Sequence, residues 1–481
     1  MIKLKDIVEK IQIIKLDQFQ DMDISAVSNN SRNIKDKTIF VAVKGSIFDG
    51  HKYIDDAIDR GVRVIVYEDD IKFRRGITYI KVKNSRKTFA DISNIIYDFP
   101  SKKMKLIAVT GTNGKTTVSK LCQFLVGKIL GPCANIGTDG AVVADELIHT
   151  DNTTPDINVI NYIMDRALCK GIKNISLEAS SHGLDQKRLE GINFDVGILN
   201  NLSTEHLDYH KTMENYFQAK LSLFKNSKIK IVNADDPYGK RAKEIYKDAI
   251  SFGINSACTY KAYDIKKDTR SISFKVNGVD FRINTIADYE IYNSLAAIAA
   301  LNQLGASLED IAKVIYDFPG VKSRFEFIAN KLGKNIIVDF AHTPRAYEEI
   351  FKSIPKDKNK IVVFGIQGDR NSEFRKLIGE VVAKNKVFAV ITTDDPKFDT
   401  YENISEDIIS GIKEFNGSYK MIKDRKEAIR FAIQKASKDD YVLMLGKGEE
   451  DFIKLKGNEK TPYSEKQTIK EVLEDLWKQY L

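Results

Sequence analysis

Short runs of apolar residues alternate with helical patterns along most of this chain. The runs lie at 38–43, 62–67 and 79–82, then at 105–110, 172–177, 194–199 and 228–232, and finally at 336–339, 361–364, 387–392 and 441–445. Strands that are apolar along their whole length are usual in parallel sheets, because helices cover both faces of such sheets. The pattern therefore predicts an α/β fold built on doubly wound parallel sheets.

The chain of 481 residues is too long for a single hydrophobic core. Two proline-containing segments, at 99–103 and 318–320, interrupt the pattern and have the composition of boundaries between domains. We therefore predict three domains, at 1–101, 102–328 and 329–481.

A glycine-rich loop separates the strand at 105–110 from a helix with one apolar face. The loop consists of Gly111, Thr112, Asn113, Gly114, Lys115, Thr116 and Thr117. Backbone N–H groups and a helix N-terminus bind phosphate in such a loop, while the lysine neutralises phosphate oxygens and the first threonine hydroxyl binds Mg²⁺. Val109 replaces the first glycine of the general pattern, but the strand and helix around the loop still predict an ATP and Mg²⁺ site.

In the last region, four strands end directly before clusters of glycine and charged residues. These clusters lie at 341–344, 368–370, 394–397 and 446–450. Because the carboxyl ends of parallel strands share one edge of the sheet, and ligands of open α/β sheets bind there, we expect a ligand cleft at this edge.

Composition excludes several classes of protein. The net charge of +8 comes from 75 basic and 67 acidic residues, and it suits an anionic small ligand better than nucleic acid because there is no long basic run. The four cysteines form no CxxC pair and are expected to be free thiols. With no signal peptide and no apolar run of membrane length, we expect a cytoplasmic protein that does not insert into membranes.

Several motifs together resemble one family. The loop at 111–117, the segment Leu177–His182 and the segment His206–His210 with Ala219-Lys220 downstream are similar to motifs of the Mur ligase and folylpolyglutamate synthetase superfamily. The resemblance covers essentially the whole chain and is most specific to the Mur ligase family, since it includes 151–155 and 339–344. It implies a central P-loop ATPase domain, an N-terminal UDP-binding α/β domain and a C-terminal Rossmann-like domain.

The resemblance also implies a reaction. Such ligases transfer the γ-phosphate of ATP to a carboxylate, and an amine then attacks the acyl phosphate to form an amide. Among the residues here, Lys115, Glu178, His206 and Lys220 match catalytic positions. Thr116, Glu178, His206 and a carbamylated Lys220 match the residues that hold Mg²⁺. Taken alone, Lys220 would be interpreted as a solvated surface charge, and only the family match reverses that interpretation.

By the same resemblance, the substrates are a UDP-N-acetylmuramoyl-dipeptide and a free amino acid, and we expect a monomer. The residues that match contacts of the UDP-muramoyl-dipeptide are Ser31, Thr153, Thr154, Ser180, Gln186 and Arg188. Asn293, Arg324 and Asp339 match nucleotide contacts, and His342 is expected in a substrate site because it follows a strand. Two departures put contacts in doubt: Asn30 replaces an aspartate, and 287–290 lacks the usual Gly-x-Phe-Asn.

The incoming amino acid is expected at the loops of the last region. Arg370 matches the residue that holds its α-carboxylate, and the other expected contacts are Asp394, Asp395, Lys397, Gly446 and Glu450. Lys397 replaces an arginine that binds a distal carboxylate in relatives, and it keeps the positive charge but loses the fork of the guanidinium. Asp395 adds negative charge, which favours a side-chain ammonium. We predict that the added amino acid is a diamino acid, either meso-diaminopimelate-like or L-lysine. The positive charge of Lys397 favours a diamino acid that carries a second carboxylate.

Two alternatives remain from the sequence. Another ligase of the superfamily, of the folylpolyglutamate or D-Ala-D-Ala-adding type, would share the ATP loop. A non-catalytic binder of UDP-muramoyl-peptides would explain the altered motifs at 287–290 and 446–450, but Lys115, Glu178 and Lys220 argue for a working enzyme.

Overall fold

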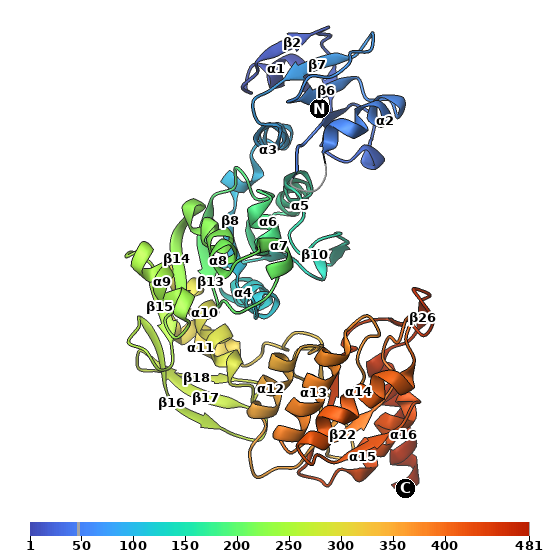
Figure 1. The fold of residues 1–481 in the computed structure, drawn as a ribbon. Coiled ribbons are helices and arrows are strands. Elements are labelled where there is room, and N and C mark those ends of the chain that lie inside the picture. The colour runs from blue at the N-terminus through green and yellow to red at the C-terminus, as the bar shows by residue number, and fades with distance from the viewer. Residues whose placement is uncertain (46–48, 481) are drawn as a thin grey trace. The chain divides into compact units, whose positions relative to one another are not determined.

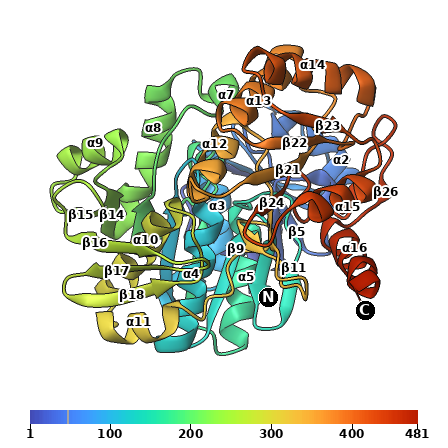
Figure 2. The ribbon, with the colours of Figure 1, turned by 90° about the horizontal axis from the view of Figure 1, so that it is seen from below.

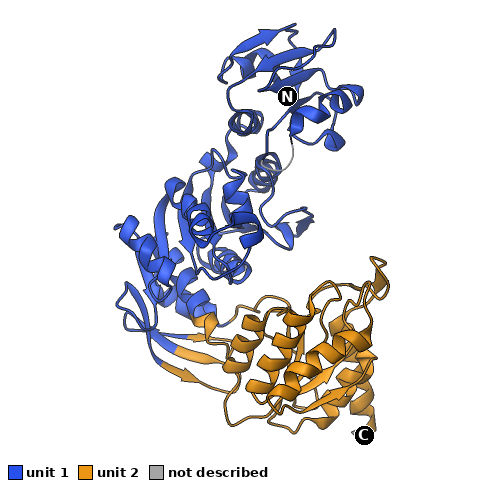
Figure 3. Cartoon of the chain, viewed as in Figure 1, with its two compact units in different colours: residues 1–264, 274–281, 292–316 blue, residues 265–273, 282–291, 317–481 orange. Residues whose placement is uncertain are grey.

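The computed structural model describes residues 1–45 and 49–480, and the chain divides into two compact units (Figure 3). Unit 1 comprises 1–264, 274–281 and 292–316, and unit 2 comprises 265–273, 282–291 and 317–481. None of the helices in the described part of the chain has the length and apolar composition of a membrane span.

The N-terminal part of unit 1 has a five-stranded sheet. Its strands, in spatial order, are β2 (Lys15–Asp17), β7 (Thr78–Lys81), β6 (Val64–Tyr67), β5 (Thr38–Val41) and β4 (Ala26–Ser28). All neighbours are parallel except β2 and β7. Its helices include α1 (Leu4–Val8), α2 (Ile54–Asp59) and α3 (Ser85–Ile96).

An eleven-stranded sheet forms the centre of the chain (Figure 1). Its order is β11 (Glu146–Ile148), β10 (Gly140–Val143), β9 (Cys133–Gly137), β12 (Asn174–Glu178), β8 (Lys105–Thr110), β13 (Phe194–Leu199), β14 (Ser227–Asn233), β15 (Ile250–Gly253), β16 (Tyr260–Lys267), β17 (Ile272–Val276) and β18 (Val279–Ile283). In this spatial order, the seven strands β9, β12, β8, β13, β14, β15 and β16 are parallel to one another. The carboxyl ends of β8, β12 and β13 therefore lie together, as a ligand site of an α/β sheet requires.

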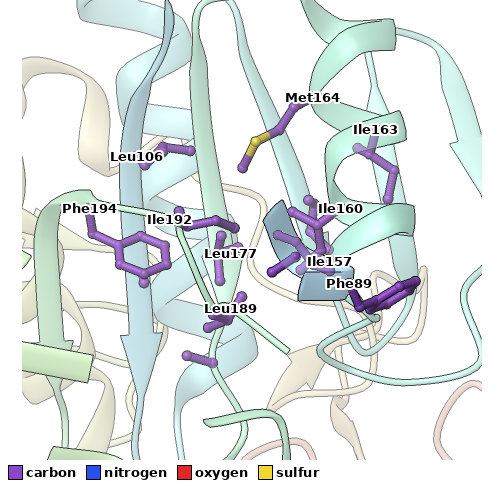
Figure 4. Packing of buried hydrophobic residues seen from close by; sticks show 14 of the residues in the cluster. Phe89, Leu106, Ile157, Ile160, Ile163, Met164, Leu177, Leu189, Ile192 and Phe194 are labelled. Atoms are coloured by element: carbon purple, nitrogen blue, oxygen red, sulfur yellow. The ribbon is translucent and has the colours of Figure 1, made fainter. Parts of the chain in front are cut away.

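Helices connect these strands: α4 (Lys115–Ile129), α5 (Ile157–Cys169), α6 (Ser181–Asp185), α7 (Leu207–His210), α8 (Met213–Leu221), α9 (Pro237–Ile245), α10 (Tyr289–Gln303) and α11 (Leu308–Ile315). One continuous core joins the N-terminal part to the central sheet. In Figure 4, Phe89 of α3 lies beside Ile157 and Ile160 of α5, and Leu177 of β12 belongs to the same cluster. Burying such side chains contributes roughly 1.5–3 kcal/mol each, so α3 is anchored to the central sheet.

Unit 2 has a six-stranded sheet in the order β19 (Glu326–Phe327), β20 (Asn335–Asp339), β24 (Tyr441–Leu445), β21 (Lys360–Phe364), β22 (Phe388–Ile391) and β23 (Tyr419–Met421). All strands are parallel except β19. Figure 2 shows α12 (Pro344–Ser353), α13 (Ser372–Lys384) and α14 (Tyr401–Glu414) on one face and α15 (Arg425–Lys435) and α16 (Glu465–Tyr480) on the other. Each face has its own apolar cluster, which confirms the doubly wound α/β fold.

Every strand expected from an apolar run is present, and β8, β13 and β24 have the expected bounds. The four cysteines are free thiols, also as expected. Within the central sheet, the sequence did not indicate β9 to β11 and β15 to β18. Most of these strands are short or carry polar residues at alternate positions, so they lack the continuous apolar run that marks a buried strand.

Candidate active site

The glycine-rich loop lies between β8 and α4, at the carboxyl edge of the central sheet. Gly114 has a φ of +82°, and a Cβ there would lie 2.3 Å from Asn293 Oδ1 and 2.5 Å from Asn200 Nδ2. Only glycine fits this position without strain. Asn293, expected near the nucleotide, is therefore packed against the loop itself.

Two asparagines after β13 hold the loop, and sequence reasoning did not single them out. Asn200 Nδ2 donates to Asn293 Oδ1 at 2.8 Å and to the carbonyl oxygen of Asn113 at 3.2 Å. Asn201 Oδ1 accepts from the backbone N–H of Asn113 at 2.9 Å, and its backbone carbonyl accepts from Thr112 N at 3.0 Å. Because these bonds fix the loop from the neighbouring strand, its phosphate-facing backbone is preorganised.

Lys115 and Lys220 meet at one carbonyl oxygen. Lys115 Nζ lies 3.0 Å from Gly111 O and 2.9 Å from Thr112 O, and Lys220 Nζ lies 2.7 Å from Gly111 O. Lys220 is 1% exposed and its Nζ lies 4.6 Å from the centroid of the Tyr216 ring. Burial, and then the charge of Lys115, hold the pKa of Lys220 well below its ordinary value. Both effects favour the uncharged amine of Lys220, which is buried in the protein and is not a solvated surface charge.

Glu178 ends β12 and is 1% exposed. Its Oε2 accepts from Thr116 Oγ1 at 3.0 Å and from Thr138 Oγ1 at 3.2 Å, and its Oε1 accepts from Thr138 N at 3.0 Å. A Cβ at Gly137 would lie 2.2 Å from Glu178 Oε1, so the carboxylate needs glycine there. Thr138, which the sequence did not single out, therefore fixes the carboxylate beside Thr116.

His206 precedes α7 directly, and its backbone has a left-handed conformation with a φ of +56°. Its exposed ring packs edge-on against His182, with the centroids 5.0 Å apart, and lies 6.2 Å from the Tyr216 ring. The Tyr216 ring therefore lies near both His206 and Lys220, and its hydroxyl is 3.2 Å from Thr112 Oγ1.

The donor set fits Mg²⁺ in its chemistry. Thr116 and Glu178 present a hydroxyl and a carboxylate oxygen 3.0 Å apart, and Mg²⁺ prefers such hard oxygen ligands. An unmodified lysine has no oxygen ligand, so any part of Lys220 in holding a second ion would depend on its reaction with CO₂.

Five of the six residues expected to contact the UDP-muramoyl-dipeptide belong to one hydrogen-bonded network. Thr154 Oγ1 donates to Glu178 O at 2.8 Å and lies 3.0 Å from Ser180 Oγ. Arg188 donates to Thr154 O at 2.8 Å and to Gln186 Oε1 at 2.7 Å. Burial lowers the pKa of Arg188, although the group remains charged at neutral pH. Thr153 joins the same network, since its Oγ1 lies 3.2 Å from Thr138 Oγ1.

Ser31 lies in the N-terminal part, at the start of a short 3₁₀ helix (Ser31–Asn33), and is buried. Asn30 accepts from Arg32 N at 3.0 Å through its side chain and so caps this helix. The residue that departs from the family pattern thus has a local structural role.

Asp339 at the end of β20 is buried, and burial raises its pKa. Its two oxygens accept from Phe325 N and Ala341 N, each at 2.7 Å, so its visible role is to hold the chain around the strand end. Arg324 lies with its guanidinium 5.4 Å from the Phe340 ring, and His342 is exposed rather than packed in a core.

The sheet of unit 2 brings the four predicted loops to one edge, in the spatial order 341–344, 446–450, 368–370 and 394–397. Arg370 is exposed and stacks on Phe374 at 5.2 Å. Lys397 Nζ lies 2.5 Å from Asp369 Oδ2. Lys397, which was expected to bind a distal carboxylate of the substrate, is therefore already paired with Asp369 of the neighbouring loop.

A buried lysine lies among the acidic residues of the same edge. Lys447 is fully buried, and its Nζ lies 2.8 Å from Asp395 Oδ1, 2.8 Å from Glu450 Oε2 and 3.5 Å from Asp394 Oδ1. Asp395 also accepts from Lys454 N at 3.0 Å. Asp395 was expected to favour a substrate ammonium, but its charge is used by Lys447 inside the protein. A buried unpaired acid would be costly, and Lys447 removes that cost.

Within unit 1, the structure thus gathers the ATP loop, Glu178, His206, Lys220 and Asn293 with the chain from Thr153 to Arg188. Within unit 2, it gathers Arg370, Lys397, Gly446 and Glu450 with Asp394 and Asp395.

Models of one protein family match three segments of this chain. The Mur ligase family catalytic domain matches 23–97, the Mur ligase middle domain matches 109–301, and the Mur ligase glutamate ligase domain matches 323–448. The UDP-N-acetylmuramoyl-L-alanyl-D-glutamate–2,6-diaminopimelate ligase of Clostridium tetani is 35% identical and covers 99% of this chain and 100% of its own. The enzyme of the same name from Listeria monocytogenes is 33% identical and covers 94% of each chain.

A solved structure of a ligase with this name superposes with a TM-score of 0.73 at 25% identity, covering 94% of this chain and 95% of the other. A D-alanyl-D-alanyl-adding ligase from Acinetobacter baumannii shares the fold, with a TM-score of 0.63 at 19% identity over 98% of both chains. The chain therefore belongs to the Mur ligase family and is an ATP-dependent amide ligase.

Proposed function

We propose that this enzyme adds a diamino acid to UDP-N-acetylmuramoyl-L-Ala-D-Glu in the synthesis of a peptidoglycan precursor. The relatives that cover nearly the whole chain carry the name of the 2,6-diaminopimelate-adding ligase, so meso-diaminopimelate is the first substrate to test. Because its substrates would be a nucleotide-linked sugar and a free amino acid, we place the reaction in the cytoplasm. The three domains at 1–101, 102–328 and 329–481 would bind the UDP-sugar, ATP and the amino acid in turn.

The observation that carries this proposal is the buried Lys220 beside the phosphate loop, with Nζ 2.7 Å from Gly111 O. An uncharged amine can add to CO₂ with loss of a proton to solvent, and the resulting carbamate would place a negative oxygen ligand next to the loop. We propose that Thr116 and Glu178 hold one Mg²⁺, and that His206 with carbamylated Lys220 holds a second. Bound Mg²⁺ would neutralise phosphate charge as the γ-phosphate moves.

The roles of the other residues follow from the chemistry. The γ-phosphate of ATP passes to the free carboxylate of the dipeptide, with Lys115 balancing the charge on the phosphate oxygens. The uncharged amino group of the diamino acid attacks the acyl carbon and loses a proton as the new C–N bond forms. The bond between the acyl carbon and the bridging oxygen breaks, and phosphate leaves with that bridging oxygen. Arg188 and the threonines at 153 and 154 would orient the dipeptide, and Arg370 would hold the α-carboxylate of the amino acid.

The test is a ligation assay with purified protein, UDP-N-acetylmuramoyl-L-Ala-D-Glu and MgATP. Meso-diaminopimelate, lanthionine, L-lysine, L-ornithine, L-alanine and D-Ala-D-Ala are compared by kcat/KM, with phosphate release and product mass as readouts. We expect a diamino acid to be best. Preference for alanine or the dipeptide would refute the proposal, and phosphate release without a new amide would show that no ligation occurs.

A further inference from the structure

Arg375 lies in the first turn of α13, immediately after the loop that carries Arg370, and is 5% exposed. Its Nη2 lies 2.7 Å from Asp399 Oδ2 and donates to Gly368 O at 2.8 Å, while its Nη1 lies 3.0 Å from Asp407 Oδ2. One guanidinium therefore contacts two loops and a neighbouring helix.

The two loops are the 368–370 loop after β21 and the 394–399 loop after β22, and they also contact each other directly. Gly368 N donates to Asp395 O at 2.8 Å, and a Cβ at Gly368 would lie only 1.8 Å from Pro396 O. Above this contact, Lys397 pairs with Asp369 at 2.5 Å. Any shift of one loop therefore changes the position of the other.

Arginine suits this place because its planar fork makes several directed bonds from one charge. Asp399 anchors the 394–399 loop, since its Oδ1 accepts from Thr400 N at 2.8 Å and from Asn403 Nδ2 at 3.1 Å. Partial burial opposes ionisation of Asp399, but the bonds from Thr400 and Arg375 hold its pKa below the ordinary value. The carboxylate is thus charged at neutral pH and pairs with the buried cation.

The helix pair α13 and α14 does not depend on this arginine. A Cβ at Gly379 would lie 2.1 Å from Ile408 O, and one at Gly411 would lie 2.1 Å from Lys376 O, so the two backbones touch along their length. Buried side chains, including Ile378, Val382, Ile408 and Ile412, fill the rest of the contact. Removing Arg375 should therefore loosen the two loops while the helices stay packed.

We propose that Arg375 is a positioning residue for the amino-acid substrate, because it fixes the 368–370 loop against the 394–399 loop and so sets the place of Arg370 and Lys397. This inference rests on the proposed function, in which those two side chains face the amino acid. Arg375 itself does not contact the substrate.

The first test compares wild type with Arg375→Gln and Arg375→Lys in the ligation assay. For Arg375→Gln we expect KM for the amino acid to rise at least tenfold, with KM for ATP and for the UDP-dipeptide within twofold of wild type. Arg375→Lys keeps the charge but loses the fork, so it should be intermediate. Arg430→Gln is the matched control, because Arg430 pairs with Asp475 at 3.0 Å between α15 and α16, away from both loops; its amino-acid KM should match wild type.

A second pair of variants separates the loops from the helices. Asp399 and Asp407 are similarly exposed, at 24% and 26%, but Asp399 belongs to the loop and Asp407 to α14. We expect Asp399→Asn to raise the amino-acid KM several-fold and Asp407→Asn to change it less than twofold. Because each of these two variants removes only one carboxylate partner of Arg375, they test the inference even if Arg375→Gln fails to fold.

Hydrogen exchange gives a readout that does not depend on activity. In Arg375→Gln, exchange should quicken in 366–371 and 395–400 but not in 376–384. Equal KM values for wild type and Arg375→Gln, or a larger effect of Asp407→Asn than of Asp399→Asn, would overturn the inference. Failure of the wild type to ligate any diamino acid would instead refute the proposed function.

Discussion

The lysines of the central loop and those of the C-terminal loops have different hydrogen-bond acceptors. At the central loop, Lys115 and Lys220 donate to backbone carbonyl oxygens, at 3.0 Å and 2.7 Å from Gly111 O. In the C-terminal loops, Lys397 and Lys447 lie against carboxylates, at 2.5 Å from Asp369 and 2.8 Å from Asp395. The carbonyl oxygens at the central loop carry no net charge, whereas the carboxylates of the C-terminal loops balance the charge of the lysines beside them.

The difference matches the ligands that each region would take. ATP and an acyl phosphate carry several negative charges, so the central loop needs the positive charge of Lys115. A free amino acid is a zwitterion, so a site with balanced charge and fixed geometry serves it better. Changing the charge should therefore be most damaging in the central region, while in the C-terminal region it should mainly alter selectivity.

The largest effect is expected from Lys220→Ala. Without the amine there is no carbamate, and we expect turnover to fall by more than about 1,000-fold, the scale seen when a major charge-stabilising group is lost. Phosphate release dependent on the amino acid measures it, with and without added bicarbonate, which should not rescue the variant. Lys228→Ala, which changes a lysine whose side chain is 73% exposed, should behave as wild type. Near-normal turnover of Lys220→Ala would remove the carbamate from the mechanism.

Glu178→Gln should come next. The substitution keeps the size of the side chain beside Thr116 and Thr138 but removes its negative charge. We expect kcat to fall about 100-fold and the Mg²⁺ concentration for half-maximal rate to rise, because a neutral amide is a poorer ligand for Mg²⁺. Titration of free Mg²⁺ at saturating ATP measures both. Glu244→Gln on the exposed face of α9 is the control. An unchanged Mg²⁺ requirement would show that Glu178 serves only the local hydrogen bonds.

Stability should also depend on pH through Lys220. The folded pKa is depressed from 10.5, so between the folded pKa and 10.5 the unfolded state binds more protons than the folded state does. By linkage, wild-type stability rises with pH in this window, by at most about 1.4 kcal/mol per pH unit. The free energy of unfolding of Lys220→Met lacks this dependence on pH. The variant should therefore be more stable than wild type at pH 7, and this difference in stability should shrink toward pH 10. Urea unfolding in CO₂-free buffer at pH 7 and 9 measures the slope, and parallel curves would contradict a neutral Lys220.

The two regions also differ in how much the sequence could predict. The ATP loop could be found because its residues are contiguous and follow an apolar run. Thr138 and Arg375 could not, because their roles depend on partners that only the fold brings near: Thr138 bonds a carboxylate 40 residues away, and Arg375 bonds one 32 residues away. The pairing of Lys447 with Asp395, 52 residues apart, likewise changed the expected role of that aspartate. A polar residue with no pattern around it carries no local signal.

The smallest expected effect tests the charge balance of the C-terminal loops. Asp369 is 58% exposed and Lys397 14% exposed, so their ion pair is a partly screened one worth up to about 1 kcal/mol. Asp369→Asn would release Lys397 to attract a distal carboxylate on the amino acid. We expect the ratio of kcat/KM for meso-diaminopimelate to that for L-lysine to rise about fivefold, the equivalent of about 1 kcal/mol. Asp439→Asn, at an exposed aspartate on the far edge of the sheet, is the control. A ratio that stays constant would mean that Lys397 does not face the side chain of the amino acid, and selectivity would then rest on the carboxylates around Lys447.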